Sequence, residues 1–279
     1  MRCMPTSPTT ARGAVREAAD DDPVALRSAA LHRGFVTYLR WYAARSFHGV
    51  RVLSGAGPVL PAGRPLIVYS NHPGWWDPAI YFLLAGALFP GRVGYGPMDG
   101  AALRQYRIMR RLGVFGLDPG ARGAVRFLRV ARQVLGDPSN MLWITAEGAF
   151  TDARVRPVTL RPGIAHLARA GGAVLMPLAL EYTFWNESKP EALAAFGSPI
   201  DADAASRDVA SRDVGAWQAR LSGGLEATMD RLAAAAMTRD PARFDTLIAG
   251  RTGVGGIYDA ARRVAAWARL RRFDPSHEA

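Results

Sequence analysis

Short apolar runs alternate with longer helix-like stretches between residues 61 and 200, and this alternation constrains the fold more than any other feature of the chain. The apolar runs predict strands at residues 65–70, 92–95, 141–145 and 173–180, with a weaker one near 194–197. The stretches between them predict helices at residues 79–89, 101–112, 121–135 and 162–170. Strands that alternate with helices form a sheet with crossover connections. We therefore expect an α/β fold with a mixed, largely parallel sheet flanked by helices.

The regions on either side of this core differ from it in composition. Residues 1–25 are polar and lack an apolar run of signal-peptide length, so they predict a disordered tail. Residues 26–60 predict a basic amphipathic helical segment, and residues 201–279 predict a C-terminal helical extension of the same domain. The extension contains predicted helices at 214–237 and 258–273 and a short helical piece near 242–249, with no predicted strand. Residues 61–200 are expected to form the α/β core.

The segment 26–60 mixes aromatic and arginine side chains at helical spacing. Its aromatic residues are Phe35, Tyr38, Trp41, Tyr42 and Phe47, and its arginines are Arg33, Arg40, Arg45 and Arg51. This mixture is typical of a helix that lies in a membrane interface with aromatic and basic anchors. It is equally typical of a helix that packs its aromatic face on the core and exposes its basic face. The sequence leaves both possibilities open.

The charge balance favours an anionic partner. The 35 Lys and Arg side chains against 24 Asp and Glu give a net charge of +11. Such a field attracts nucleic acid, anionic lipid headgroups or phosphorylated substrates. The single cysteine, Cys3, rules out an intrachain disulfide and a cysteine-based zinc site, which favours a reducing, intracellular compartment. The histidines are scattered, so we expect no metal site, and no apolar run reaches the roughly 20 residues of a membrane-spanning helix.

Residues 70–78, Ser-Asn-His-Pro-Gly-Trp-Trp-Asp-Pro, lie between a predicted strand and a predicted helix. A carboxylate five positions after a histidine can orient the imidazole, so His72 and Asp77 could form a dyad with His72 as general base. The alternative is structural, because Asp77 precedes a proline as a helix N-cap does, and His72 could be an ordinary turn residue. Adjacent aromatic rings in such a turn commonly line a binding site, which favours a function for Trp75 and Trp76.

The order and spacing of several blocks resemble the glycerolipid acyltransferases, the superfamily of lysophosphatidate and lysophospholipid acyltransferases. Asn71-His72 with Asp77 matches the family's Asn-His, four residues, Asp. Glu147-Gly148 follows a predicted strand, where the family has Phe-Pro-Glu-Gly-Thr-Arg. Residues 161–165 and 174–180 look like the family's Lys-x-Gly helix start and its Val-Pro-Val strand. The resemblance covers about residues 60 to 200.

This resemblance implies an acyltransferase that moves a fatty acyl group from acyl-CoA or acyl carrier protein to a hydroxyl of a lysophospholipid or other lipid-like acceptor. It implies that His72 is the general base, that Asp77 orients it, and that Glu147 and Gly148 belong to the acceptor pocket. A carboxylate before a glycine at a strand end can also serve only to bond nearby backbone N–H groups. The aromatic segment 181–187 either shapes a pocket or packs on the core. No cofactor is implied, because the acyl thioester is a co-substrate.

The chain departs from the family at the end of the second block. The family's arginine, which binds the acceptor phosphate through two hydrogen bonds, is replaced by Phe150. Arg154 and Arg156 follow closely and could take its place, or they could be solvated surface residues. The acceptor is therefore not necessarily lysophosphatidate, nor any phosphate. The other candidate substrate-binding residues are Asn71, Trp75 and Trp76.

A lipid-like acceptor implies contact with a membrane, and we expect peripheral contact with the anionic cytoplasmic face through the arginines at 33–51 and 262–272. No nucleic-acid partner is expected, because the arginines follow no helix-turn-helix, finger or RNA-binding pattern. Two other functions remain open. One is a non-catalytic basic module that binds anionic membrane or nucleic acid, and the other is a thioester hydrolase that uses the same dyad.

Overall fold

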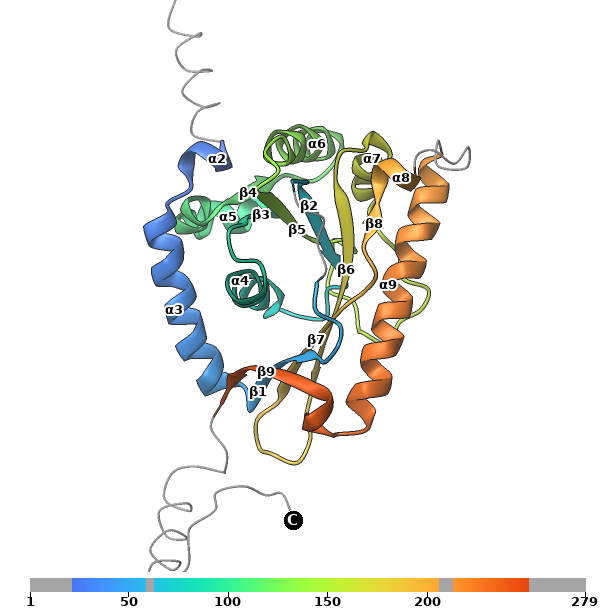
Figure 1. Ribbon diagram of the computed structural model, residues 1–279. Coiled ribbons are helices and arrows are strands. Elements are labelled where there is room, and N and C mark those ends of the chain that lie inside the picture. Colours follow the sequence, from blue (N-terminus) through green and yellow to red (C-terminus); the bar gives the residue numbers. More distant parts are fainter. Residues whose placement is uncertain (1–21, 59–62, 206–212, 251–279) are drawn as a thin grey trace, which may run out of the picture.

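The computed structural model describes residues 22–58, 63–205 and 213–250, whose arrangement is shown in Figure 1. The predicted helix at 258–273, the arginines at 262–272 and residues 1–21 of the predicted tail lie outside these residues. Asp22 caps a short helix, α2 (Pro23–Leu26), by accepting hydrogen bonds from backbone N–H groups of its first turn. The prediction of a disordered tail is therefore wrong for residues 23–25, because the cap and a proline start a helix there.

One mixed sheet forms the centre of the molecule, with strand order β4-β3-β5-β2-β6-β7-β1-β9 and with β8 paired to β6. The strands are β1 (Gly49–Leu53), β2 (Leu66–Ser70), β3 (Val93–Asp99), β4 (Val114–Leu117), β5 (Asn140–Thr145), β6 (Val174–Thr183), β7 (Glu191–Phe196), β8 (Ile200–Asp201) and β9 (Phe244–Ala249). Neighbouring strands from β4 to β6 are parallel, as are β1 and β7. The pairs β6–β7, β6–β8 and β1–β9 are antiparallel. The predicted mixed, largely parallel sheet is confirmed.

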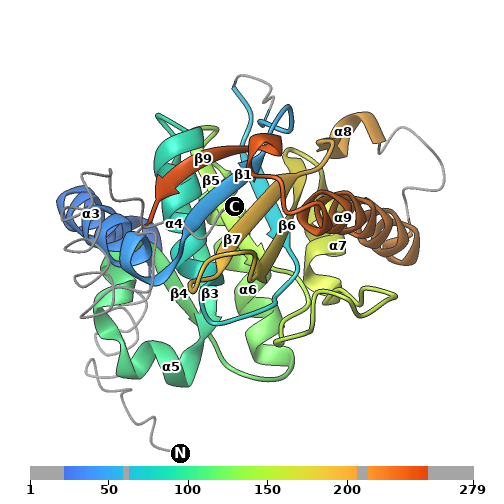
Figure 2. The ribbon, with the colours of Figure 1, turned by 90° about the horizontal axis from the view of Figure 1, so that it is seen from below.

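Helices cover both faces of the sheet, as Figures 1 and 2 show. On one face, α3 (Ala29–Ser46) and α4 (Asp77–Leu88) share an apolar cluster with Val68 and Met176. On the other face, α6 (Ala121–Leu135), α7 (Pro162–Ala170) and α9 (Val214–Met237) share a cluster with Ile67 and Leu175. The shorter helical pieces are α5 (Gly100–Gln105), η1 (Arg107–Leu112), α8 (Ala202–Ala205) and η3 (Pro241–Arg243). Because both faces are covered, the central strands are apolar throughout.

Most predicted core elements are confirmed. The helices predicted at 121–135, 162–170 and 214–237 are α6, α7 and α9. The predicted strands are β2, β3, β5, β6 and β7, of which all except β2 are longer than predicted. The helix predicted at 101–112 is divided into α5 and η1 at Tyr106, whose backbone leaves the helical conformation.

Two further strands come from the flanking segments, where only helix was predicted. Residues 49–53 form β1, and residues 244–249 form β9, so the helical predictions are wrong at these places. β1 pairs with β9 on one side and with β7 on the other. β4 was also not predicted. Short strands are stabilised by partners that lie far away in the sequence, so their own residues show little local pattern.

Helix α3 packs on the core as one of its two predicted arrangements requires, and part of its surface stays exposed. Leu39 and Ala43 are buried against the core, whereas Tyr38 and Trp41 are exposed. The exposed arginines of the helix are Arg33, Arg40 and Arg45. The helix therefore packs on the core and still presents aromatic and basic side chains to its surroundings. Among the described residues, no helix is sufficiently long and apolar to cross a membrane.

The contact between α3 and α4 contains a histidine whose protonation affects stability. Burial lowers the pKa of His32 to about 4, and the charge of Arg27 acts in the same direction. The unfolded chain takes up this proton near pH 6.5. The neutral His32 therefore contributes stability above pH 6.5, and this contribution is lost as the pH falls from 6.5 towards 4.

A His32→Gln variant is expected to lose less stability in acid than the wild type. Between pH 7.5 and pH 5, its free energy of unfolding should fall by about 2 kcal/mol less, because glutamine takes up no proton. Urea unfolding of both proteins at the two pH values measures this difference. Equal losses would show that His32 is not held neutral in the folded protein.

Candidate active site

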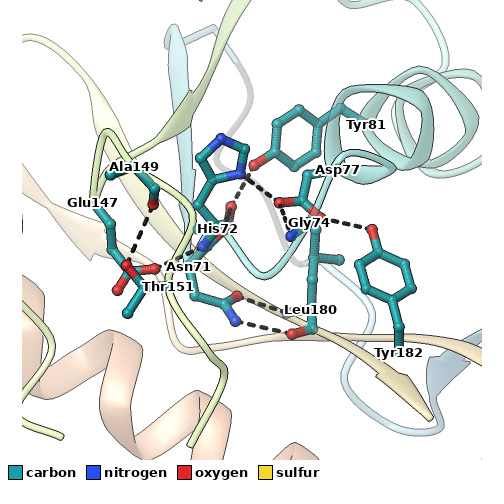
Figure 3. A network of polar contacts seen from close by, with 11 residues as sticks. Asn71, His72, Gly74, Asp77, Tyr81, Glu147, Ala149, Thr151, Leu180 and Tyr182 are labelled. Atoms are coloured by element: carbon teal, nitrogen blue, oxygen red, sulfur yellow. Dashed lines mark hydrogen bonds and ion pairs between the residues drawn. The ribbon is translucent and has the colours of Figure 1, made fainter. Parts of the chain in front are cut away.

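The connection between β2 and α4 carries the predicted dyad at the carboxyl end of the parallel strands (Figure 3). Asn71 directly follows β2, and its buried amide bonds both backbone groups of Leu180 in β6. Its Nδ2 donates to the Leu180 carbonyl oxygen at 2.9 Å, and its Oδ1 accepts from the Leu180 N–H at 2.8 Å. The Asn71 side chain thus continues the hydrogen bonding between β2 and β6 beyond the last paired residue of β2. Asn71 thus holds the turn in place, and its predicted contact with substrate stays a prediction.

His72 and Asp77 lie together as predicted. Nδ1 of His72 is 2.6 Å from Oδ2 of Asp77. The Asp77 side chain is 0% exposed, whereas that of His72 is 16% exposed. Because a carboxylate only accepts hydrogen bonds, Nδ1 carries the proton of the neutral imidazole and Nε2 presents a lone pair. Nε2 forms no hydrogen bond with any residue that the structure describes.

Asp77 is bonded on both of its oxygens. Oδ1 accepts from the Tyr182 hydroxyl at 2.7 Å, and Oδ2 also accepts from the Gly74 N–H at 3.2 Å. Asp77 is the first residue of α4, and the cap position is occupied by Trp76, which forms no side-chain cap bond. The alternative in which Asp77 serves as the helix N-cap is therefore wrong. Its carboxylate is instead directed at the imidazole.

Tyr182 is a site residue to which the sequence assigned no role. It lies near the end of β6, where its ring stacks on Phe47 with centroids 5.9 Å apart. Burial, together with the charge of Asp77, raises the pKa of the Tyr182 hydroxyl well above its usual range, so the hydroxyl stays protonated and donates to Asp77. The aromatic composition of segment 181–187 indicated a pocket or a packing contact. Only the position of β6 beside β2 shows that the Tyr182 ring reaches Asp77.

Replacing Tyr182 with phenylalanine is expected to lower kcat by about tenfold with KM unchanged, because Asp77 loses a hydrogen bond to a charged group. Steady-state kinetics of the purified variant measure both constants. Tyr81→Phe is the matched control, because the Tyr81 hydroxyl is also buried but bonds Ser70. A similar loss in both variants, or a change confined to KM, would contradict a positioning role for Tyr182.

The loop after β5 binds the backbone of His72 from the other side. Oε2 of Glu147 accepts from the His72 N–H at 2.7 Å, and the Thr151 N–H donates to the His72 carbonyl oxygen at 3.0 Å. Burial raises the pKa of Glu147, and its bond with the His72 N–H opposes this shift. Gly148 has a φ of +69°, and a Cβ there would lie 2.8 Å from Cγ of Arg161. Glu147 therefore bonds backbone, as in the structural alternative, and at the same time lies beside the dyad.

Phe150 lies against the dyad, whereas the two arginines of its loop are ion-paired. The ring centroids of Phe150 and His72 are 4.5 Å apart, and Phe150 is 65% exposed. Nε and Nη2 of Arg154 donate to the carboxylate two positions earlier at 2.8 Å and 2.7 Å. Nη2 of Arg156 donates to Asp230 of α9 at 2.7 Å. Arg154 and Arg156 were the predicted anion-binding residues, and their hydrogen bonds direct both side chains to these carboxylates and not to His72.

The two tryptophans of the turn have different surroundings. Trp75 is 70% exposed. Trp76 packs against Phe47 and Tyr42, with centroid distances of 4.7 Å and 5.1 Å. Trp75 is therefore accessible for the predicted contact with a ligand, whereas Trp76 joins the turn to α3 and to Phe47, the residue that follows it.

The chemistry that this arrangement offers is the removal of a proton from a substrate. His72 is partly exposed, oriented by a buried carboxylate and unbonded at Nε2, as a general base requires. In the described part of the chain, no group of three or more His, Cys, Asp or Glu side chains could hold a metal ion.

Comparison with known proteins places these residues in a family. Residues 56–181 match the model of the Acyltransferase family, and this range contains both the dyad and the loop from Glu147 to Thr151. Among solved structures, the chain is similar to the crystal structure of the 1-acyl-sn-glycerophosphate (LPA) acyltransferase PlsC from Thermotoga maritima. The TM-score is 0.50 and the identity 12%, over 78% of this chain and 83% of that chain, so this likeness concerns the fold. Curated proteins give no match. The match over residues 56–181 bears out the predicted resemblance to the acyltransferases, and the fold shared with PlsC agrees with it.

Proposed function

We propose that this chain transfers a fatty acyl group from acyl-CoA or acyl carrier protein to a hydroxyl of a lysophospholipid or other lipid-like acceptor. The acyltransferase family of residues 56–181 and the fold shared with PlsC support acyl transfer to a lipid. The thioester donor follows from the resemblance of the motifs to the glycerolipid acyltransferases. No further cofactor enters the proposal.

The observation that carries the proposal is the 2.6 Å bond between Nδ1 of His72 and Oδ2 of Asp77, which leaves Nε2 as a base. As the acceptor oxygen attacks the thioester carbonyl carbon, Nε2 takes the hydroxyl proton and Asp77 stabilises the imidazolium. The tetrahedral intermediate then expels the thiolate, which takes the proton from Nε2. The products are an ester and a free thiol, and no bond to the enzyme is formed.

Thiol release from oleoyl-CoA tests this proposal. The reaction is run with and without a pool of lysolipids and lipid alcohols, for the wild type and for His72→Ala as the inactive reference. Release that depends on the acceptor and disappears in the variant is expected. Release without acceptor would indicate a thioester hydrolase. Absence of release with both oleoyl-CoA and oleoyl-acyl carrier protein would favour a non-catalytic module.

We also propose that the acceptor is reached at an anionic membrane surface through the α3 aromatic surface, defined as Tyr38, Trp41, Tyr42, Trp75 and Trp76. Successive rings of this surface are in contact, from Trp41 through Tyr38 and Tyr42 to Trp76 and Trp75, with centroid distances between 5.1 Å and 6.0 Å. It therefore extends from α3 to the turn that carries His72. Aromatic rings together with arginines are typical of membrane-interface contacts.

Arg40 and Arg45 on α3 are expected to strengthen this membrane contact by about 1 kcal/mol each. The double variant Arg40→Gln/Arg45→Gln should therefore bind vesicles of phosphatidylglycerol and phosphatidylcholine about thirtyfold more weakly than the wild type. Co-sedimentation at low salt measures the affinity. Arg129→Gln/Arg132→Gln on α6 is the control, because it removes the same charge from exposed positions elsewhere. Equal weakening by both double variants would contradict a contact through α3.

A further inference from the structure

We infer that the acceptor used at His72 is an uncharged lipid alcohol and that Phe150 selects it over a phosphorylated one. The inference rests on the proposed function, of which it specifies the substrate class. It is carried by the position of one exposed aromatic ring and by the ion pairs of Arg154 and Arg156 in the same loop.

Two hydrogen bonds from the loop place Phe150 beside the imidazole. The loop is bonded to both backbone groups of His72, at its N–H by Glu147 and at its carbonyl oxygen by Thr151. Between these two bonds the Phe150 ring lies with its centroid 4.5 Å from that of the imidazole, at an interplanar angle of 50°. Because this ring is 65% exposed, an acceptor that reaches the imidazole passes beside it. The group next to the reacting hydroxyl therefore meets an apolar surface.

A phosphate in that place would lose water beside an aromatic ring and two carboxylates. The face of an aromatic ring carries partial negative charge, and a charged group is costly to bury unless it is paired. The carboxylates of Glu147 and Asp77 also lie beside His72. Arg154 and Arg156 neutralise carboxylates of the protein, Arg154 through two hydrogen bonds and Arg156 through one to Asp230. An uncharged acceptor avoids these costs.

The same ring supports the catalytic step. His72 becomes an imidazolium when it takes the hydroxyl proton, and a cation in contact with an aromatic face is stabilised. The ring of Phe150 is within the distance at which this attraction acts. Phe150 thus favours the charge that develops on His72 and disfavours negative charge on the acceptor.

Arg161 is the cation that could oppose this selection. Its side chain lies across Gly148, and it forms no side-chain hydrogen bond or ion pair with the described residues. If the acceptor carried a phosphate, Arg161 would be the residue to bind it. The variant Arg161→Gln therefore belongs to the test.

Two acceptors that differ only in the phosphate test the inference: 1-oleoylglycerol and 1-oleoylglycerol 3-phosphate, in phosphatidylcholine vesicles with oleoyl-CoA as donor. We expect the wild type to show a kcat/KM at least about tenfold higher for 1-oleoylglycerol, the discrimination that one charge-assisted hydrogen bond provides. Phe150→Arg should lower this ratio by at least about tenfold, because it supplies a cation beside His72. Val125→Arg, at an exposed position on α6, adds the same charge elsewhere and should leave the ratio unchanged. Circular dichroism confirms that the variants are folded.

Several results would overturn the inference. A wild type that prefers the phosphorylated acceptor, and loses this preference in Arg161→Gln, would assign the selection to Arg161 and a phosphate. Equal ratios in Phe150→Arg, Phe150→Ala and the wild type would show that Phe150 selects nothing. Acylation of lysophosphatidylcholine alone would overturn the substrate class while leaving the proposed function intact. Absence of thiol release with every acceptor would count against the proposed function itself.

Discussion

His72→Ala is expected to lower kcat for acyl transfer by about 10²–10⁴ while the protein remains folded. A hydroxyl is a poor nucleophile while it keeps its proton. The rate falls because the variant has no base that takes this proton from the acceptor. The fold is expected to survive because the bonds from the loop to residue 72 use backbone groups, which alanine retains. Acceptor-dependent thiol release measures the rate, and thermal unfolding measures the fold.

Asp77→Asn separates the orientation of the imidazole from the presence of the base. An asparagine amide can donate to Nδ1, which favours the tautomer with its proton on Nε2, so we expect a loss comparable to that of His72→Ala. The buried side chain keeps its size in this variant. A folded His72→Ala or Asp77→Asn enzyme with wild-type kcat would exclude the dyad as the catalytic base.

Glu191→Ala is expected to lower the free energy of unfolding by about 3–5 kcal/mol, the largest stability effect that we predict. Glu191 is 1% exposed, and its carboxylate accepts from Nε of Arg51 at 2.9 Å and bonds Nδ1 of His48 at 2.5 Å. Nη1 of Arg51 also donates to Thr246 at 2.7 Å, so the network joins β1, β7 and β9. Without the carboxylate, a buried guanidinium keeps only a hydroxyl partner, and an unpaired buried charge is strongly destabilising. Urea unfolding at neutral pH measures the loss.

Asp118→Ala is the control for this prediction. Asp118 pairs with Arg104 at 3.1 Å, but both side chains are more than half exposed. Solvent screens such a pair, so we expect a loss of at most about 1 kcal/mol. A loss in Glu191→Ala no larger than that in Asp118→Ala would show that the buried network contributes little to stability.

Local patterns were sufficient to predict most of the core elements and the proximity of His72 to Asp77. The helices α6, α7 and α9 repeat apolar residues at the helical period, and β2 and β5 are continuous apolar runs, so both signals are visible without knowledge of the partners. His72 and Asp77 are also local, because they lie five positions apart in one turn. The family motifs added Glu147 and Gly148 to this site.

The other strands and the other contacts of the site depend on how the strands of the sheet pair and in which register. β1 and β9 were missed because they become strands only through pairing with each other and with β7. Tyr182 bonds Asp77 across 105 positions, because β6 runs beside β2 and extends past its end. Phe150 lies against His72 because its loop bonds the backbone of that residue, through the Glu147 side chain and through the Thr151 N–H. Such contacts depend on which strands are neighbours and on their register, and pairing across long sequence separations leaves no periodic signal in either segment.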